Sequence, residues 1–188
     1  MHRREALKNL AIITGGAVLV PSCNFEKEDI LSAYQNLSVT ESMRNVLAQI
    51  ADTIIPAGSI QGAGDLAVQD FILVMVNDCV QADQQDMFTK GLQGFDAFSK
   101  EVAGSKFSKL EQTDKERVVT QGLSISDEDA DAGKKTMLEF LRITKQFTIQ
   151  GYMMSEYIMT QVKPYHLIPG EYNGAVLINS ISTPKING

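Results

Sequence analysis

One long apolar stretch, residues 136–163, constrains the fold of this chain more than any other feature. Between Thr136 and Pro164 there is no internal proline and only one glycine, Gly151, which favours a single helix of about seven turns or more. Its apolar side chains cover most of the circumference: Met137, Leu138, Leu141, Phe147, Ile149, Tyr152, Met153, Met154, Tyr157 and Ile158. A soluble helix of this kind needs neighbours on several sides. We therefore predict a central helix that ends at Pro164, since proline cannot continue the hydrogen-bond ladder.

The same stretch contains a stripe of small residues at steps of four, three and four: Thr144, Thr148, Gly151 and Ser155. Such a stripe predicts close approach of another backbone. After Pro164, the Pro169-Gly170 pair indicates a turn in a loop.

Helical patterns account for most of the chain before this stretch. Ser38-x-x-Glu41 fits a capping box, and apolar residues at steps of three and four then predict a helix that ends at Pro56. Asp65 is a candidate cap for a second helix that runs to about Cys79. A third helix is predicted over about 84–102, with Gly104 as its C-terminal cap.

A second capping box, Thr113-x-x-Glu116, predicts a short fourth helix. The acidic run 126–131 is either a solvated turn or the capped start of the long helix. Residues 175–182 are a short strand or an extended tail. The fold class that follows is all-α: a single-domain irregular helical bundle around one long central C-terminal helix, with an extended C-terminal tail.

The N-terminus has the pattern of an export signal. Arg3 and Arg4 precede an apolar run from Ala11 to Val20, which is too short to span a bilayer. Paired arginines favour the twin-arginine route, and Cys23 after small residues resembles a bacterial lipobox. We expect a signal peptide over 1–22, a lipid-anchored, loosely ordered tether over 23–38, and a helical domain over 39–188. The alternative is a plain N-terminal anchor helix with Cys23 as a bystander.

Charge and residue content narrow the function classes. Segment 1–22 has a net charge of +2, so the chain's −6 becomes −8 without it, and an acidic protein does not bind nucleic acid by charge. If Cys23 is lipidated, Cys79 is the only other cysteine, so no internal disulfide forms. His166 is a lone histidine, and Glu156 with Glu171 forms an acid–base pair only if folding joins them. We predict no catalytic residues, metal site or cofactor site in this chain.

Two groups of residues carry a family resemblance. The first is 51–56 (ADTIIP) with Gly62-Ala63; the second is Phe147-Thr148 and 151–156 (GYMMSE) with 169–174 (PGEYNG). In order and spacing they resemble the two signatures of the gluconate 2-dehydrogenase subunit 3 family, over roughly Thr40 to Ala175. Gly62-Ala63-Gly64 also resembles the start of a dinucleotide loop, but it lacks the third glycine and a preceding strand.

The resemblance implies a non-catalytic small subunit. It pairs with a large FAD-containing subunit of the glucose-methanol-choline type, in some complexes also with a cytochrome c subunit, and it assists export, anchoring and stability of a sugar or polyol dehydrogenase. The expected location is the periplasmic side of a membrane, held by Cys23. We assign the loop residues Tyr165, His166, Glu171 and Tyr172 to the partner interface.

Two other classes of function are alternatives to the small-subunit role. A free-standing surface lipoprotein that binds a carbohydrate would need aromatic platforms, whereas the chain has no Trp and five Tyr. An independent oxidoreductase would hold its own chromophore.

Overall fold

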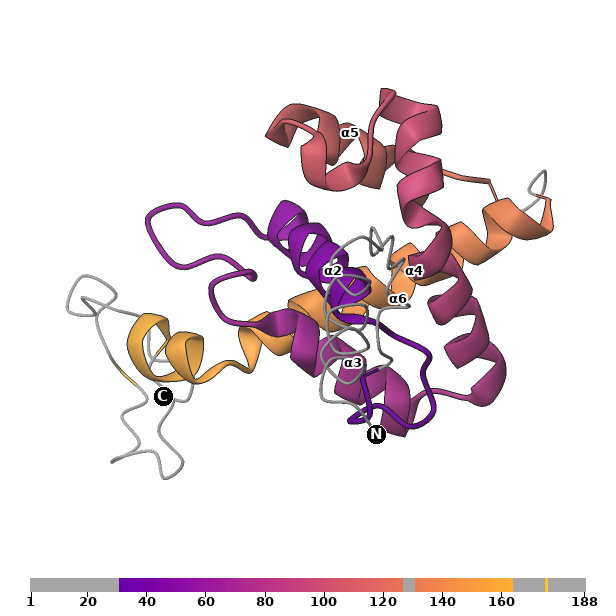
Figure 1. Cartoon of the computed structure of the whole chain (residues 1–188). Helices are drawn as coiled ribbons and strands as arrows, with labels where there is room; N and C mark the ends of the chain where they lie inside the picture. The colour runs from indigo at the N-terminus through magenta and orange to yellow at the C-terminus, as the bar shows by residue number, and fades with distance from the viewer. Residues whose placement is uncertain (1–30, 127–130, 164–174, 176–188) are drawn as a thin grey trace, which may run out of the picture.

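The computed structural model describes residues 31–126, 131–163 and 175 (Figure 1). Its elements, in order, are α2 (Glu41–Ile54), α3 (Val68–Cys79), α4 (Ala82–Ala103), the 3-10 helix η1 (Phe107–Lys109), α5 (Gln112–Leu123), α6 (Ala132–Met153) and the π-helix η2 (Ile158–Val162). Within these ranges there is no β-strand. The all-α class is therefore confirmed, while the predicted C-terminal tail lies outside the described residues.

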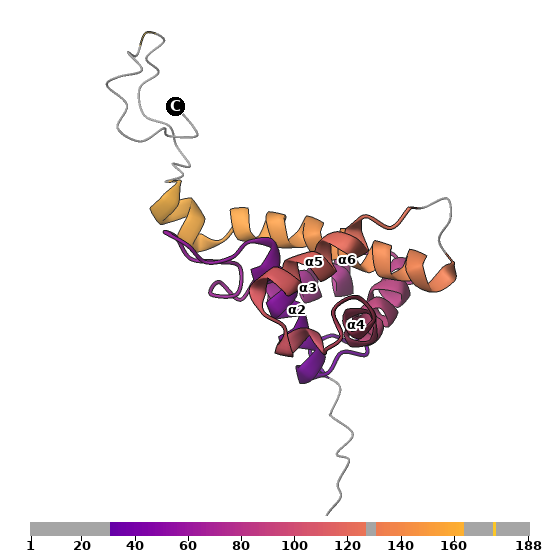
Figure 2. The same cartoon turned by 90° about the horizontal axis from the view of Figure 1, so that it is seen from above.

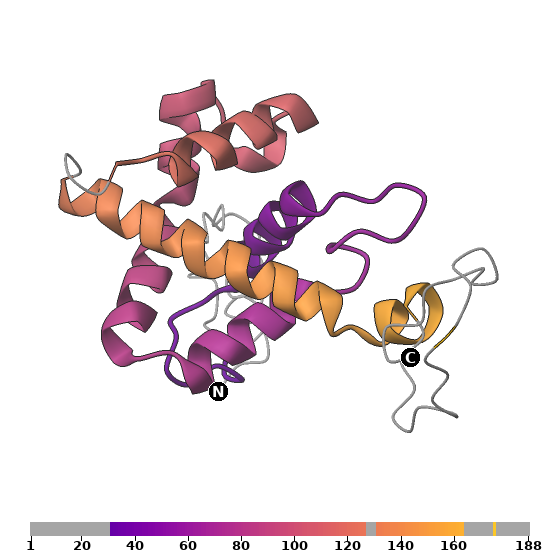
Figure 3. The ribbon, with the colours of Figure 1, turned by 180° about the vertical axis from the view of Figure 1, so that it is seen from behind.

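Helix α6 is central, as its apolar circumference predicts. It packs against α2, α3, α4 and α5, and it crosses the whole bundle when the molecule is seen from behind (Figure 3). Aromatic rings hold α4 against α6: the ring centroid of Phe140 lies 5.3 Å from that of Phe88 and 5.7 Å from that of Phe95. Gly91 permits this close contact, because a Cβ at that position would collide with Cβ of Phe140.

The long helix is shorter at its C-terminal end than the sequence predicts. It begins at Ala132, where the Asp131 carboxylate caps the amide of Lys134 at 2.8 Å. It ends at Met153 rather than at Pro164. The Ser155 hydroxyl donates to the carbonyl of Tyr152 at 2.8 Å and accepts from the amide of Ile158 at 3.4 Å. Ser155 thus ends one helix and caps the next, which is a role that serine favours over a place inside a helix.

Three other helix starts differ from the predicted caps. Thr40, not Ser38, caps α2 through the amide of Met43. Asp65 does not cap α3, because its carboxylate accepts from the amide of Gly62 at 3.0 Å and the N-cap is Ala67. Helix α5 begins at Gln112 without a side-chain cap, so the box at Thr113 does not form. Local hydrogen bonds of the preceding loops therefore decide these boundaries. Gly104 does end α4, with φ 77.

The last part of the predicted tether is packed on the domain. Leu37 and Val39 are buried, and the amide of Leu31 donates to the carbonyl of Val39 at 2.8 Å. Asn36 donates two hydrogen bonds of 2.9 Å to Asn77 at the end of α3, from its amide N–H to the Asn77 side chain and from its Nδ2 to the Asn77 carbonyl. From Leu31 onward the chain is therefore a strap on the bundle, and the expected loose order of residues 31–38 is wrong.

Candidate functional site

The two segments that carry the family signatures meet at the C-terminal end of α6. The phenol of Tyr152 donates a hydrogen bond of 2.8 Å to the carbonyl of Gln61, although 91 residues separate them. Tyr152 is buried, and this burial, with a smaller contribution from Tyr157, raises the pKa of its phenol. A buried phenol needs a partner for its O–H, so this bond fixes the loop between α2 and α3 against α6.

The loop folds back tightly on the end of α2. The amide of Ala63 donates to the carbonyl of Ile55 at 2.9 Å, and the amide of Gly64 donates to the Asp52 carboxylate at 3.3 Å. A Cβ on Gly62 would lie 2.5 Å from the backbone nitrogen of Ala57. The Gly-Ala-Gly run therefore serves a tight turn after a helix, and no strand precedes it as a dinucleotide loop requires.

Gly151 is the contact point between α6 and α3. A Cβ at this position would lie 2.5 Å from Cδ1 of the Phe71 ring. The neighbouring members of the small stripe, Thr144 and Thr148, are buried, and each hydroxyl donates to the carbonyl four residues before it. The stripe does permit close approach at Gly151, but the group that approaches is an aromatic side chain rather than a backbone.

Apolar side chains remain exposed where the two signatures meet. The exposed fractions are 40% for Ile60 in the loop, and 44%, 39% and 64% for Ile149, Met153 and Met154 at the end of α6. A cavity of about 410 Å³ lies beside them, lined by Gln61, Leu66, Ser155, Glu156, Tyr157 and Gln161. A group of exposed apolar residues rimmed by polar ones is typical of a protein contact surface.

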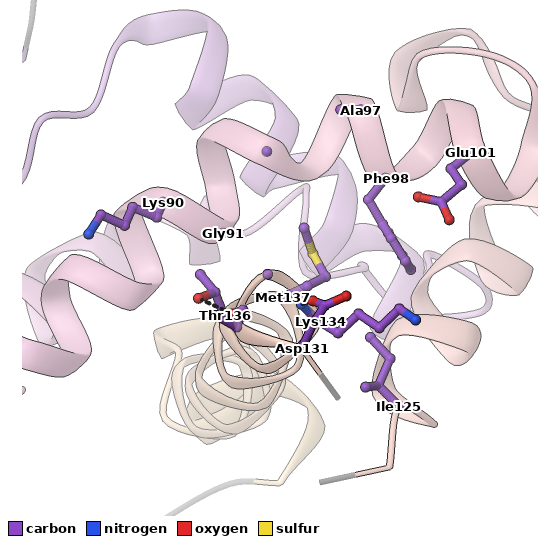
Figure 4. Close-up of a pocket in the computed structure, with 13 residues that line it drawn as sticks. Lys90, Gly91, Ala97, Phe98, Glu101, Ile125, Asp131, Lys134, Thr136 and Met137 are labelled. Atoms are coloured by element: carbon purple, nitrogen blue, oxygen red, sulfur yellow. Dashed lines mark hydrogen bonds between the residues drawn. The ribbon is translucent and has the colours of Figure 1, made fainter. Parts of the chain in front are cut away.

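A larger cavity, of about 770 Å³, lies between α4 and the first turns of α6 (Figure 4). Figure 4 shows Phe98 and Met137 between the helices, while Lys90 points away from them. Two of its four charged residues are engaged: Asp131 caps α6, and Lys90 pairs with Asp86 at 2.6 Å. The described part of the chain contains no group of three His, Cys, Asp or Glu residues able to hold a metal ion. We therefore assign no chemistry to this cavity.

All the site residues predicted from sequence lie outside the described ranges: Arg3, Arg4, Cys23, Tyr165, His166, Glu171 and Tyr172. Their roles stay predictions. Sequence reasoning missed the exposure of Ile149 and Met153, which it placed in an all-round apolar helix. Their exposure could have been predicted, because helical spacing places both in the same sector of α6 as the polar residues Lys135, Arg142 and Gln146. None of the described helices is long and apolar enough to cross a membrane.

The family model described as gluconate 2-dehydrogenase subunit 3 matches residues 41–170, which include the first signature group and the second as far as Gly170. No curated protein and no solved structure gives a significant match.

Proposed function

Because the chain belongs to the gluconate 2-dehydrogenase subunit 3 family, we propose that it is the non-catalytic small subunit of an exported, flavin-dependent sugar or polyol dehydrogenase. The family model spans most of the helical domain, and the hydrogen bond from Tyr152 to Gln61 joins its two signature segments. That match carries the proposal. Its partner is a large FAD-containing subunit of the glucose-methanol-choline type, which supplies the redox chemistry.

The exposed surface around Met153 and Met154 supports a binding role. Methionine side chains adapt to irregular partner surfaces, and Met154 leaves 64% of its area exposed. Pairing with a large subunit would cover this area.

The direct test is co-purification. The full chain, tagged at its C-terminus, is expressed in its native host and purified from membranes in mild detergent. We expect a flavoprotein to co-elute, identified by its flavin absorbance and by mass spectrometry, whereas an untagged strain gives none. Elution of the chain without any flavoprotein would count against an accessory-subunit role. Elution with bound carbohydrate instead would favour the free-standing lipoprotein.

Export is tested at the paired arginines. We propose that Arg3 and Arg4 direct the folded chain, with its flavoprotein as passenger, through the twin-arginine route. Replacing both by Lys retains the charge, so we expect the chain and the flavoprotein to accumulate in the cytoplasm. Full periplasmic levels of the flavoprotein in this variant would refute the passenger role.

Anchoring is tested at Cys23. We propose that acyl chains on this cysteine hold the protein at the periplasmic side of a membrane, since more than one chain is needed for stable attachment. The variant Cys23→Ala should release the domain into the soluble fraction with an unchanged melting temperature. Membrane fractionation that persists without incorporation of labelled fatty acid would contradict lipidation.

A further inference from the structure

Helix α6 has one long face that no other described element covers. Its helical spacing places Lys135, Arg142, Gln146, Ile149 and Met153 within a sector of roughly 60°, and all five are exposed. From above, α6 lies along one side of the bundle, with α2, α3 and α4 on its other side (Figure 2). From behind, the same face is open along its length (Figure 3). We call these five residues, with Lys145 at the edge of the sector, the α6 outer face.

The C-terminal half of this face is apolar. Ile149 is 44% exposed and Met153, one turn further, is 39% exposed. Residues four apart on a helix are neighbours, so these two side chains form one continuous apolar area. Met154 and Ile60 are also exposed. Tyr152, next to Met153 in α6, bonds the loop that contains Ile60, so the apolar half of the face ends beside the junction of the two signature segments.

The N-terminal half of the face is basic, in a protein that is otherwise acidic. Residues 132–163 contain five Lys and Arg against two Glu, a net charge of +3, whereas the whole chain has −6. Lys135 and Lys145 form no ion pair within the described residues. The net charge of this segment thus has the opposite sign to that of the whole chain, and the electrostatic complement of its exposed lysines is a surface rich in carboxylates.

We propose that the α6 outer face docks a folded protein whose contact surface is an apolar depression edged by Asp and Glu, and that this protein is the flavoprotein large subunit. The inference rests on the function proposed above. Ile149 and Met153 fill the depression, while Lys135 and Lys145 face the carboxylates at its edge. The apolar half excludes water and so lowers the local dielectric constant. The attraction between the two lysines and the carboxylates is therefore stronger.

Two other occupants fit the observations less well. An anionic membrane surface favours helices with many Lys or Arg and with Trp, Phe or Leu on the apolar side, whereas this face offers Ile and Met, and the chain as a whole is negative. A second copy of the chain would bring an acidic surface, but a head-to-tail contact of this helix face with a different surface extends into a ring or a filament rather than a dimer.

The test compares variants of the α6 outer face with matched variants elsewhere, all in the tagged full chain. Ile149→Asp is paired with Val74→Asp on α3, because Val74 is also aliphatic and is 46% exposed. Lys145→Glu is paired with Lys109→Glu in η1, another exposed lysine. We expect Ile149→Asp to lower recovery of the flavoprotein per tagged chain about tenfold or more, as for a central interface residue. Lys145→Glu should lower it severalfold, most strongly at low salt. The two controls should match the wild type.

The outcomes separate this inference from the proposed function. If the wild type recovers the flavoprotein and both α6 variants do so equally well, the docking surface is elsewhere and only the present inference fails. If the wild type recovers none, both fail. Binding of the wild type to phosphatidylglycerol vesicles that Lys145→Glu abolishes, or a wild-type dimer that Ile149→Asp dissociates, would also overturn it. Unchanged melting curves of the variants would show that lost binding does not reflect lost folding.

Discussion

Replacement of Gly151 by leucine should destabilise the domain by up to about 2 kcal/mol. Leucine improves helix propensity over glycine by somewhat less than about 1 kcal/mol. Against this gain, the Cβ of residue 151 would lie 2.5 Å from Cδ1 and 3.0 Å from Cγ of Phe71. The contact is at the base of the ring, so the whole side chain must move. Overpacking of this kind costs typically about 1–3 kcal/mol, which exceeds the propensity gain over most of its range.

A double-mutant cycle with Phe71→Ala measures that contact. We expect Gly151→Leu to cost less in the Phe71→Ala background, by about 1 kcal/mol or more, because the ring that it displaces is gone. Urea unfolding followed by circular dichroism gives all four free energies of unfolding. Gly94→Ala in α4 is the control, since the nearest atom to its Cβ would be Cε of Met137 at 4.0 Å; it should stabilise by up to about 1 kcal/mol.

Additive free energies in this cycle would refute the reasoning. Additivity would mean that Phe71 and residue 151 do not share a site, and that any loss in Gly151→Leu has another cause. A loss in Gly94→Ala equal to that in Gly151→Leu would show instead that α-helical glycines here are required for some reason other than packing.

Two further changes test the interior. Gln69→Met should stabilise by about 1 kcal/mol in the same unfolding assay, because the Oε1 atom of Gln69 is buried without a partner among the described residues; a loss would indicate a donor elsewhere. Tyr152→Phe should cost about 0.5–1.5 kcal/mol through the lost bond to Gln61. Burial raises the folded-state pKa of Tyr152, so its contribution is complete below the unfolded pKa of about 10 and is lost as pH rises through the folded pKa. Melting curves between pH 8 and about 11 should therefore fall less steeply for Tyr152→Phe than for the wild type; parallel curves would contradict this.

The spacing of apolar residues at steps of three and four was enough to predict the α-helices and the central place of α6. Phe88, Leu92 and Phe95 recur at helical spacing in α4, and all are buried. Gly104 was recognisable as a cap because only glycine takes a positive φ freely. These features depend on residues near one another in sequence, which is where pattern reasoning is strongest.

The features that could not be predicted depended on which of several competing contacts forms. Asp65 has the chemistry of a helix cap, but the amide of Gly62 was a competing donor. Ser155 looked like a small residue in a packed stripe, whereas it ends α6 by bonding Tyr152. The α6 outer face could not be found from apolar content alone, because Ile149 and Met153 have the same side chains whether a neighbouring helix covers them or not. The polar residues Lys135, Arg142 and Gln146 in the same sector of α6 were the available signal, and the arrangement of the other helices shows that the sector is exposed.

The packed strap from Leu31 to Val39 limits how far the helical domain can lie from Cys23. Since the strap is held to α3 through Asn36 and Asn77, the chain between Cys23 and Leu31 comprises residues 24–30 alone. Seven residues, fully extended, reach at most about 25 Å, which is less than the length of α6. A domain attached through Cys23 therefore stays within one protein diameter of the lipid surface. If Cys23 is lipidated as proposed, whatever the domain holds works in the layer next to the membrane.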